Sequence, residues 1–223
     1  MSDRNIIDQL GTWEGYSASF AERRIVKGKA QVWIELHPRD DRKMTCQECG
    51  APARSVHSMK DRWVRDLPLF DAETHLLVWR CRVRCEPCGG PKLESVSWLP
   101  KYARVTGRFA DSVGYLCQVL PIKHVADFYG LHWHTVKTID KAFLTEFYSA
   151  PRLEGVSAIV MDEFALEKGH CYARVVLEPS VKRVLWVGRG RSREDVRPFF
   201  ELLGKKGRKE LQVVAMDMSP AYI

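Results

Sequence analysis

The sequence predicts an α+β protein that is built from several domains. Two Cys-X-X-Cys motifs lie in the first half of the chain, helical patterns around a glycine follow them, and the last third combines apolar strands with an amphipathic helix. A chain of 223 residues is long enough for two or three small domains. We predict a small β domain over residues 1–95, a helical domain over 96–150 and the beginning of an α/β domain over 151–223.

Composition limits the class of partner. Lysine and arginine outnumber aspartate and glutamate by 35 to 28, which gives a formal net charge of +7. This balance suits a nucleic acid, although charge alone suits an anionic membrane surface equally well. No apolar run is long enough to cross a bilayer, and the N-terminus has no signal-peptide core. We therefore expect a cytoplasmic protein with no membrane partner.

The first elements in chain order are strands between Trp13 and Leu36. Ala30, Val32, Ile34 and Leu36 alternate with larger or more polar neighbours, as in a strand that buries one face. The run Lys27-Gly28-Lys29 is a suitable hairpin turn before them. This region is expected to form a small sheet that leads into the cysteine motifs.

The two cysteine motifs predict a metal centre. Each is followed by glycine, in the runs Cys46-Gln47-Glu48-Cys49-Gly50 and Cys85-Glu86-Pro87-Cys88-Gly89. Glycine allows the tight turn that points backbone N–H groups at sulfur, and four thiolates complete a tetrahedral zinc site. We predict a structural Zn²⁺ held by Cys46, Cys49, Cys85 and Cys88. The alternative is a pair of redox motifs or unligated thiols.

The remaining cysteines are predicted to be buried thiols, because seven cysteines in a reducing compartment do not indicate a disulfide framework. Cys81 alternates with Leu77, Trp79 and Val83 on one face of a strand, so a fifth ligand is not expected.

Basic residues are frequent between and beside the two Cys-X-X-Cys-Gly motifs, which we call the knuckles. The segment between them is expected to loop out and return, and the strand that follows ends at the second knuckle. The basic residues of loop and strand are Arg54, Lys60, Arg62, Arg65, Arg80, Arg82 and Arg84. Such a surface suits phosphate contacts, and a solvated basic face without a specific partner is the alternative.

A helix-turn-helix pattern follows a connector at 91–102, in which Trp98 is expected to be an anchoring residue. An apolar helical stripe begins at Phe109, and the next helix, from Ile122, carries the small residue Ala126 before the turn at Gly130. The second helix of the motif, about 132–147, would present His134, Thr135, Lys137, Thr138 and Lys141 to the phosphates and base edges of DNA. The alternative is an ordinary helical hairpin with a polar surface.

Four strands and one helix are predicted in the last third. The strands are 158–162, 170–177, 183–187 and 211–217. The helix precedes the fourth strand, is capped by Ser192 and ends near Gly204; its apolar stripe is Val196, Phe199, Phe200 and Leu203. This order is that of the first half of a ribonuclease-H-like fold, in which the first and fourth strands lie side by side.

Each of those two neighbouring strands ends in an aspartate, Asp162 and Asp217. Two carboxylates on adjacent strand ends repel each other unless a cation lies between them, and Mg²⁺ prefers such hard oxygen ligands. We therefore predict that Asp162 and Asp217 bind Mg²⁺ and act in phosphodiester chemistry. The alternative is that each aspartate merely ends a strand in a turn.

The order of these motifs resembles one family. A CxxCG knuckle, Arg65-Asp66-Leu67-Pro68, a second knuckle, the helix-turn-helix, Met161-Asp162-Glu163-Phe164 and Met216-Asp217-Met218-Ser219 follow one another as in the ISL3 family of bacterial insertion-sequence transposases. The resemblance runs from about Trp13 onward. It implies a zinc-binding domain and a helix-turn-helix that hold the terminal inverted repeats of the element in double-stranded DNA. It also implies a DDE ribonuclease-H-like core that cleaves and joins DNA with Mg²⁺.

Carried over by motif, the resemblance makes Asp162 the first catalytic acid and Asp217 the second, and it implies a nucleoid-associated protein and a homodimer on DNA. Glu163 is expected on the other strand face and is not a ligand. The third acid of the family is a glutamate farther along, and no residue up to Ile223 can be assigned to it. We therefore expect a truncated product that is inactive alone. The alternative is a non-catalytic zinc-dependent DNA-binding remnant or regulator.

Overall fold

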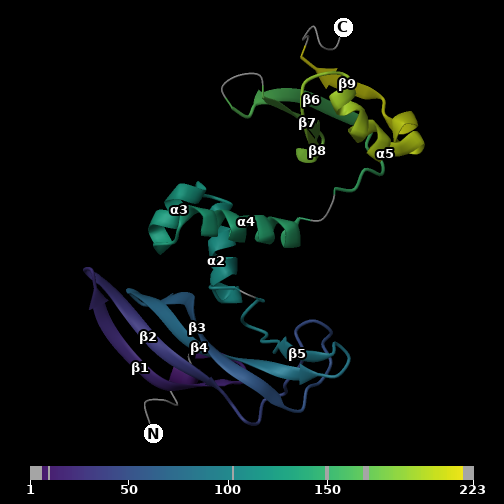
Figure 1. Cartoon of the computed structure of the whole chain (residues 1–223). Helices are drawn as coiled ribbons and strands as arrows, with labels where there is room; N and C mark the ends of the chain where they lie inside the picture. The colour runs from purple at the N-terminus through teal and green to yellow at the C-terminus, as the bar shows by residue number, and fades with distance from the viewer. Residues whose placement is uncertain (1–6, 10, 102, 149–150, 168–170, 218–223) are drawn as a thin grey trace. The chain divides into compact units, whose positions relative to one another are not determined.

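The structure is a computed structural model that describes residues 7–9, 11–101, 103–148, 151–167 and 171–217. The chain divides into two compact units, Met1–Thr145 and Glu146–Ile223 (Figure 1). His170, at the predicted start of one strand, and Met218 and Ser219 of the family motif lie outside the described residues.

The first unit contains a twisted five-stranded sheet. Its strands are β1 (Tyr16–Val26), β2 (Lys29–Pro38), β3 (Val56–Leu69), β4 (Ala72–Cys85) and β5 (Gly90–Leu93). The order across the sheet is β1-β2-β4-β3, and β5 pairs with β4. The β2–β4 pair is parallel and the other pairs are antiparallel. Residues from both sides of the first cysteine motif therefore meet in one sheet.

Two hairpins make up most of this sheet. The predicted turn between β1 and β2 is confirmed: Lys27 has φ 50° and Gly28 has φ 78°, the left-handed conformation that a two-residue hairpin turn requires. The predicted loop between the knuckles is wrong for most of its length. Residues 56–69 are the strand β3, which pairs with β4 along a hairpin that turns at Phe70 and Asp71.

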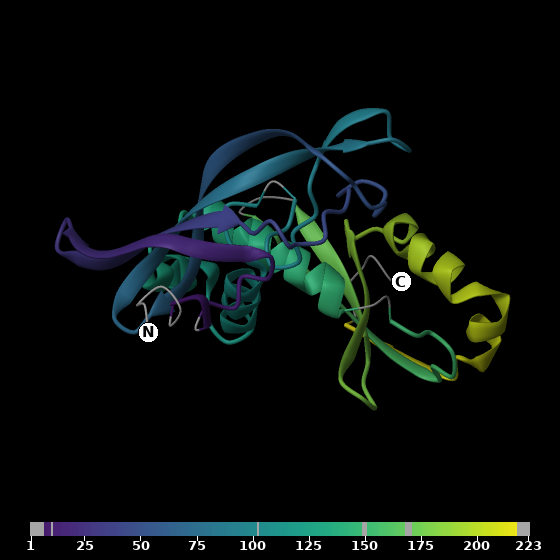
Figure 2. The same ribbon diagram turned by 90° about the horizontal axis from the view of Figure 1, so that it is seen from below.

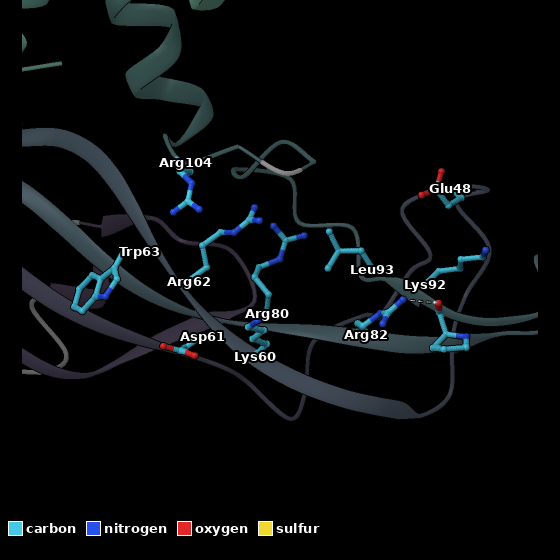
Figure 3. A pocket seen from close by; sticks show the side chains of 11 residues that line it. Glu48, Lys60, Asp61, Arg62, Trp63, Arg80, Arg82, Lys92, Leu93 and Arg104 are labelled. Carbon is cyan, nitrogen blue, oxygen red and sulfur yellow. Dashed lines mark hydrogen bonds between the residues drawn. The ribbon is translucent and has the colours of Figure 1, made fainter. Parts of the chain in front are cut away.

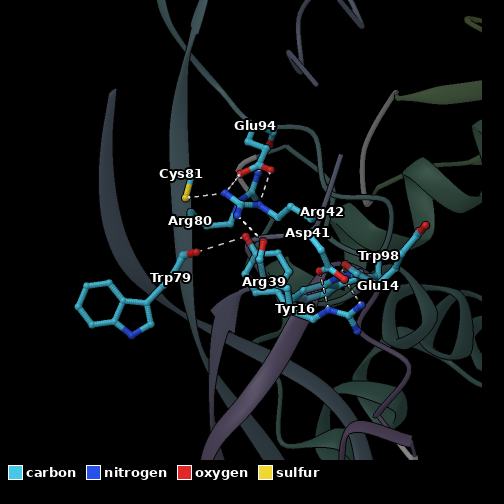
Figure 4. A network of polar contacts seen from close by, with 10 residues as sticks. All are labelled: Glu14, Tyr16, Arg39, Asp41, Arg42, Trp79, Arg80, Cys81, Glu94 and Trp98. Carbon is cyan, nitrogen blue, oxygen red and sulfur yellow. Dashed lines mark hydrogen bonds and ion pairs between the residues drawn. The ribbon is translucent and has the colours of Figure 1, made fainter. Parts of the chain in front are cut away.

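One face of the sheet carries the core of this unit. Leu36, Leu76, Val78 and Leu99 are fully buried there, beside Trp13 and Tyr16. Trp98 anchors the segment after β5, as predicted: its Nε1 donates to the backbone oxygen of Glu14 at 3.0 Å, and its ring meets that of Tyr16 edge to face at 5.3 Å. Figure 4 shows these residues beside a polar network around Arg42 and Glu94. The segment after β5 is therefore held against the sheet.

Three helices follow in the same unit: α2 (Gly107–Cys117), α3 (Ile122–Tyr129) and α4 (Trp133–Phe147). Phe109, Val113, Val125 and Val136 form their buried centre. The predicted turn is present, since Gly130 ends α3 in the left-handed conformation with φ 62° and ψ 35°. Helices α3 and α4 therefore form the helix-turn-helix that the sequence predicts.

The helices are joined to the sheet through consecutive residues of β3. Asp66 is fully buried and accepts hydrogen bonds from Trp13, Thr106 and Arg108. Arg65 donates to the backbone oxygen of Tyr129 at 3.2 Å. The sheet and the helices thus share buried polar contacts as well as apolar ones.

The second unit has the strand order that the sequence predicts. Its elements are β6 (Ala158–Ala165), β7 (Tyr172–Glu178), β8 (Arg183–Arg189), the short 3₁₀ helix η1 (Glu194–Val196), α5 (Arg197–Glu210) and β9 (Val213–Met216). The sheet order is β8-β7-β6-β9. Strands β6 and β9 pair in parallel, so the first and fourth strands lie side by side. The predicted fold class, an α+β chain with zinc-binding, helix-turn-helix and ribonuclease-H-like parts, is confirmed.

Helix α5 covers one face of this sheet (Figure 2). Val196, Phe199 and Leu203 are buried against Ile159 and Val176. The predicted cap Ser192 lies before the 3₁₀ helix η1, where its Oγ accepts from the N–H of Asp195 at 3.3 Å and the Asp195 carboxylate accepts from the N–H of Ser192 at 2.8 Å. Helix α5 itself begins after Val196, which makes no side-chain cap. The predicted end near Gly204 coincides with a break: Gly204 has the non-helical angles φ 71° and ψ 179°, and a second helical segment follows to Glu210.

Candidate functional site

The four motif cysteines meet in space. The sulfur atoms of Cys46, Cys49, Cys85 and Cys88 all lie within 4.8 Å of one another. Sγ of Cys46 is 3.9 Å from Sγ of Cys88, and Sγ of Cys49 is 3.5 Å from Sγ of Cys85. Zinc–sulfur bonds of about 2.3 Å at tetrahedral angles separate sulfurs by about 3.8 Å. The thiols therefore fit a closed four-thiolate zinc site.

Local backbone geometry sets up this cluster. Gly50 and Gly89 follow the knuckles with φ 70° and φ 63°, a conformation that favours glycine. In the first knuckle the N–H of Glu48 points at Sγ of Cys46 at 3.4 Å, and the N–H of Gly50 bonds the Cys46 carbonyl oxygen at 2.8 Å. The second knuckle is the turn between β4 and β5, in which Cys85 pairs with Gly90. The predicted role of Gly50 and Gly89, to allow a tight turn at the end of each knuckle, is therefore confirmed.

The electrostatics of the cluster favour a cation. A hydrogen bond from the backbone N–H of Cys49 lowers the pKa of Cys46 to about 7. The hydrogen bond with the side chain of Cys49 raises the pKa of Cys88 to about 12, and burial and the negative charge of Cys46 act in the same direction. Four thiolates can coexist at neutral pH only if a metal ion balances them.

Cys81 is not part of this cluster. It is buried in β4, as the sequence predicts, and its Sγ lies 3.4 Å from Nη2 of Arg42. Burial raises the pKa of the Cys81 thiol, so it stays neutral. It is therefore a structural residue.

The basic residues between the knuckles divide into two groups. Arg65 does not belong to a phosphate-binding surface, because its side chain is 15% exposed, lies 3.6 Å from Glu73 and holds the end of α3. Arg80 is also buried, with 5% exposure. Arg82 and Arg84 are exposed. Sequence periodicity places side chains on a strand face, and it cannot tell which part of that face other segments cover.

Helix α4 exposes most of the residues that we predicted to contact DNA. His134, Thr138 and Lys141 are exposed, and Thr135 and Lys137 are half-buried. Nζ of Lys137 lies 4.9 Å from the ring centre of Trp133, which is 40% exposed. The opposite side of the helix is buried through Val136 and Phe143. The helix therefore presents a basic and aromatic surface.

The two aspartates lie at the same level of neighbouring strands, but the predicted strand end at Asp162 is wrong, because β6 continues to Ala165. Met161 of β6 pairs with Met216 of β9, so Asp162 and Asp217 are the next residues of two parallel strands in register. Both are exposed. The Asp162 carboxylate accepts from the N–H of Glu163 at 2.7 Å. Of the residues that the structure describes, no third carboxylate, histidine or cysteine joins these two closely enough to complete a metal site.

Glu163 has a separate partner. Its carboxylate lies 2.7 Å from Nη2 of Arg174, a fully buried residue of β7 that also donates to the backbone oxygen of Ser192 at 2.9 Å. This arrangement agrees with the prediction that Glu163 faces away from Asp162. Sequence reasoning missed Arg174, since nothing in its strand distinguishes it from an exposed arginine.

No helix of the described residues is long and apolar enough to cross a membrane.

Three family models match the chain. A zinc-finger model of transposases IS204, IS1001, IS1096 and IS1165 matches residues 42–88. The helix-turn-helix domain of transposase family ISL3 matches residues 94–144. A DDE transposase model of the ISL3 type matches residues 159–223. Each match falls on the corresponding element of the structure.

Curated proteins agree with these matches. The chain is 45% identical over 222 residues to the transposase for insertion sequence element IS1001 of Bordetella parapertussis, with 100% of this chain and 54% of that protein covered. It is 27% identical over 195 residues to the transposase for IS1557 of Mycobacterium tuberculosis (strain ATCC 25618 / H37Rv), with 84% of this chain and 43% of that protein covered. The chain thus spans about half the length of the curated relatives it matches.

No solved structure matches this chain. The three models nevertheless follow one another in the order of the zinc cluster, the helix-turn-helix and the paired aspartates, and the IS1001 relative aligns along the chain. The chain therefore belongs to the ISL3 family of transposases.

Proposed function

We propose that this chain supplies DNA recognition and the first two catalytic carboxylates of the transposase of a bacterial insertion sequence. The observation that carries the proposal is the parallel register of β6 and β9, in which Asp162 and Asp217 directly follow the paired residues Met161 and Met216. Membership of the ISL3 family supports it. The partner is double-stranded DNA, in particular the terminal inverted repeats of the element, bound as a homodimer on paired ends.

Helix α4 is the DNA-reading element in this proposal. Its exposed basic and polar side chains are of the types that bind phosphates and base edges in a major groove. The residues in this role are His134, Thr135, Lys137, Thr138 and Lys141. Helix α3 precedes it across the turn at Gly130, as in other helix-turn-helix proteins.

The carboxylates act through Mg²⁺. Asp162 and Asp217 would share divalent metal, which supplies activation of a water or a 3′-hydroxyl and stabilises the leaving oxygen of a phosphodiester. The residues of this chain hold and orient the ions. Two carboxylates alone bind Mg²⁺ weakly, so we further propose that the 223-residue chain does not transfer DNA strands unaided.

Zinc has a structural role in the proposal. A closed four-thiolate site leaves no open position for water, so Cys46, Cys49, Cys85 and Cys88 would hold Zn²⁺ to fix the end of the β3–β4 hairpin.

DNA recognition is tested by measuring the affinity of the chain for a duplex that carries an end of the element and for a scrambled duplex. Lys137→Gln with Lys141→Gln should weaken binding to the element end at least 10-fold, because two cationic contacts are lost. Lys205→Gln with Lys206→Gln, two exposed residues of α5, is the matched control and should bind like the wild type. Equal affinity for both duplexes would contradict end recognition.

The carboxylates are tested by Mn²⁺ binding, with Mn²⁺ as a spectroscopic substitute for Mg²⁺. Asp162→Asn with Asp217→Asn should abolish binding of Mn²⁺ to the second unit and leave DNA affinity unchanged. Unchanged Mn²⁺ binding would contradict the metal-binding role. Robust Mg²⁺-dependent strand transfer by the wild-type chain would contradict the proposed inactivity.

The second candidate function is a non-catalytic DNA-binding regulator, which the exposure of α4 and the two-carboxylate site also favour. It predicts the same DNA affinity, with no metal binding at Asp162 and Asp217. The Mn²⁺ measurement therefore separates the two functions.

A further inference from the structure

A basic groove lies in the first unit beside the first cysteine motif, whose Glu48 is one of its lining residues. It has a volume of about 590 Å³ and is formed by β3, β4, β5 and the segment before α2. Its cationic lining residues are Lys60, Arg62, Arg80, Arg82, Lys92 and Arg104. Figure 3 shows the guanidinium groups of Arg62 and Arg80 extending toward each other, with Arg104 above them on the segment before α2. Residues that are distant in the sequence thus bring positive charge into one cavity.

Arg80 is a built part of this groove. Its side chain is 95% buried, since only 5% is exposed, and its Nη2 donates to the backbone oxygen of Glu94 at 2.9 Å. Its Nε and Nη1 have no hydrogen-bond partner among the described residues. Buried N–H groups of a charged side chain are costly to leave without an acceptor. The two remaining donors of Arg80 therefore call for an anionic acceptor in the groove.

The charges of the groove repel one another. Burial lowers the pKa of Arg80, and the positive charge of Arg62 lowers it further. Arginine nevertheless stays protonated in proteins, so the repulsion persists. Two carboxylates also line the groove, Asp61 and Glu48, and Glu48 is paired with Lys101 at 2.5 Å, so the acids offset only part of the charge of the six cations. A bound anion would relieve this repulsion.

The shape of the groove favours an extended polyanion over a single small ion. The cations run from Lys92 on β5 to Arg104, which lies three residues before the start of α2. Trp63, which is 45% exposed, adds a flat apolar surface among the lining residues. A row of arginines and lysines with an aromatic side chain matches alternating phosphates and sugars.

We propose that this groove binds consecutive phosphates of the DNA backbone, as a second and sequence-independent contact surface beside the helix-turn-helix. The inference rests on the proposed DNA-binding function of the chain. Arg62, which is half-buried, and Arg82, which is exposed, contact the phosphates through their guanidinium groups. Arg80 donates hydrogen bonds to a phosphate from the floor of the groove. Helix α4 supplies discrimination between sequences, and the groove supplies affinity for any duplex.

The test is the salt dependence of binding of the full chain to a random-sequence DNA duplex. Each phosphate contact contributes about 0.9 to the slope of log K against log salt concentration. Arg82→Gln with Arg104→Gln, two exposed residues, should reduce the slope by about 1.8 and weaken binding to the random duplex and to the element end by the same factor. Arg80 is left unchanged, because its Nη2 holds the backbone at Glu94.

The matched control removes the same charge from the opposite edge of the sheet. Arg23→Gln with Arg24→Gln alters two β1 side chains that are 57% and 48% exposed, and it should leave the slope unchanged. A slope that is equal in wild type and groove variant overturns the inference. A reduction that is the same in both double variants also overturns it, because the effect is then one of net charge.

Two further readouts separate the other outcomes. Inorganic phosphate alone is titrated into the wild-type chain by calorimetry; saturation by phosphate, with an unchanged DNA slope in the groove variant, assigns the groove to free phosphate and overturns the inference. If the wild type binds random DNA with the expected slope but shows no preference for element ends, end recognition by α4 fails and the groove stands. Absence of any DNA binding overturns both.

Discussion

Oδ1 of Asp66 accepts a 2.6 Å hydrogen bond from Oγ1 of Thr106, and this contact joins the sheet of the first unit to its helices. Thr106 is also the N-cap of α2, because its Oγ1 accepts from the N–H of Phe109 at 3.3 Å. The same carboxylate also accepts hydrogen bonds from Nε1 of Trp13 at 2.9 Å and from Nε of Arg108 at 2.8 Å. One buried acid thus fixes the end of β3, the start of α2 and the N-terminal segment.

Replacing this acid should destabilise the first unit. Asp66→Ala leaves Thr106, Trp13 and the guanidinium of Arg108 without their acceptor, and we expect the free energy of unfolding to fall by about 3 kcal/mol. The value lies at the low end for a buried pair because Arg108 is 35% exposed and can be rehydrated. Denaturant unfolding measures it. Asp71→Ala, which removes a carboxylate 71% exposed, should cost less than 1 kcal/mol; equal costs would contradict the role of Asp66.

The same residue predicts a pH dependence. Burial raises the pKa of Asp66, but the hydrogen bonds from Arg108, Thr106 and Trp13 outweigh it and hold the pKa below its ordinary value. The folded-state pKa is therefore lower than the unfolded-state value of about 4. Its contribution to stability is present above about pH 4 and is lost as the pH falls through the folded-state pKa. Unfolding measured from pH 6 to pH 2 should show this loss, and Asp66→Asn should be flatter below about pH 4.

Zinc should be bound in one equivalent and should stabilise the knuckles. Cys49→Ser or Cys85→Ser removes one of four ligands, so zinc content measured by atomic absorption should fall to near zero and the end of the β3–β4 hairpin should lose protection from hydrogen exchange. Cys171→Ser, an exposed thiol of the second unit, is the control and should retain zinc. Full zinc content in the Cys49 variant would contradict the four-thiolate site.

The turn of the helix-turn-helix should not tolerate a side chain. An alanine at position 130 would have to keep the backbone angle φ 62°, and its Cβ would lie 2.8 Å from Oε1 of Glu73. We expect Gly130→Ala to lower the free energy of unfolding by about 1–2 kcal/mol from the left-handed conformation, with a further loss from displacing Glu73. Gly28→Ala is the matched control, since Gly28 has φ 78° and no atom within 4 Å of its Cβ. An equal loss in both variants would show that Glu73 yields freely.

Local patterns were sufficient for most of the elements. Lys27-Gly28 and Gly130 predict their turns because positive φ is cheap in glycine and common at such positions. Gly50 and Gly89 predict the tight turns that end the two knuckles, because their φ is positive as well. The order of strands and helix in the last third predicts the pairing of β6 with β9, because connections between adjacent elements leave few topologies.

Other features could not be predicted from local patterns. The segment 56–69 has no strict apolar alternation, since one end of β3 is exposed and only Val64 and Asp66 are buried, so its pairing with β4 was missed. The Arg65-Asp66 pair belongs to a motif of the family, but its function in joining the sheet to the helices depends on Thr106, Arg108 and Tyr129. Such contacts connect residues about 40 to 64 positions apart.

The sequence by itself therefore determined the chemistry of this protein: four thiols in two glycine-ended knuckles, a helix-turn-helix with a polar second helix, and an aspartate in or directly after each of two apolar strands. These follow from residue type and short spacing. Only the tertiary structure decided which charges are buried, that Arg65 and Asp66 join the helices to the sheet, and that Arg62, Arg80 and Arg104 converge on one groove. Burial and convergence depend on long-range packing, which no local pattern encodes.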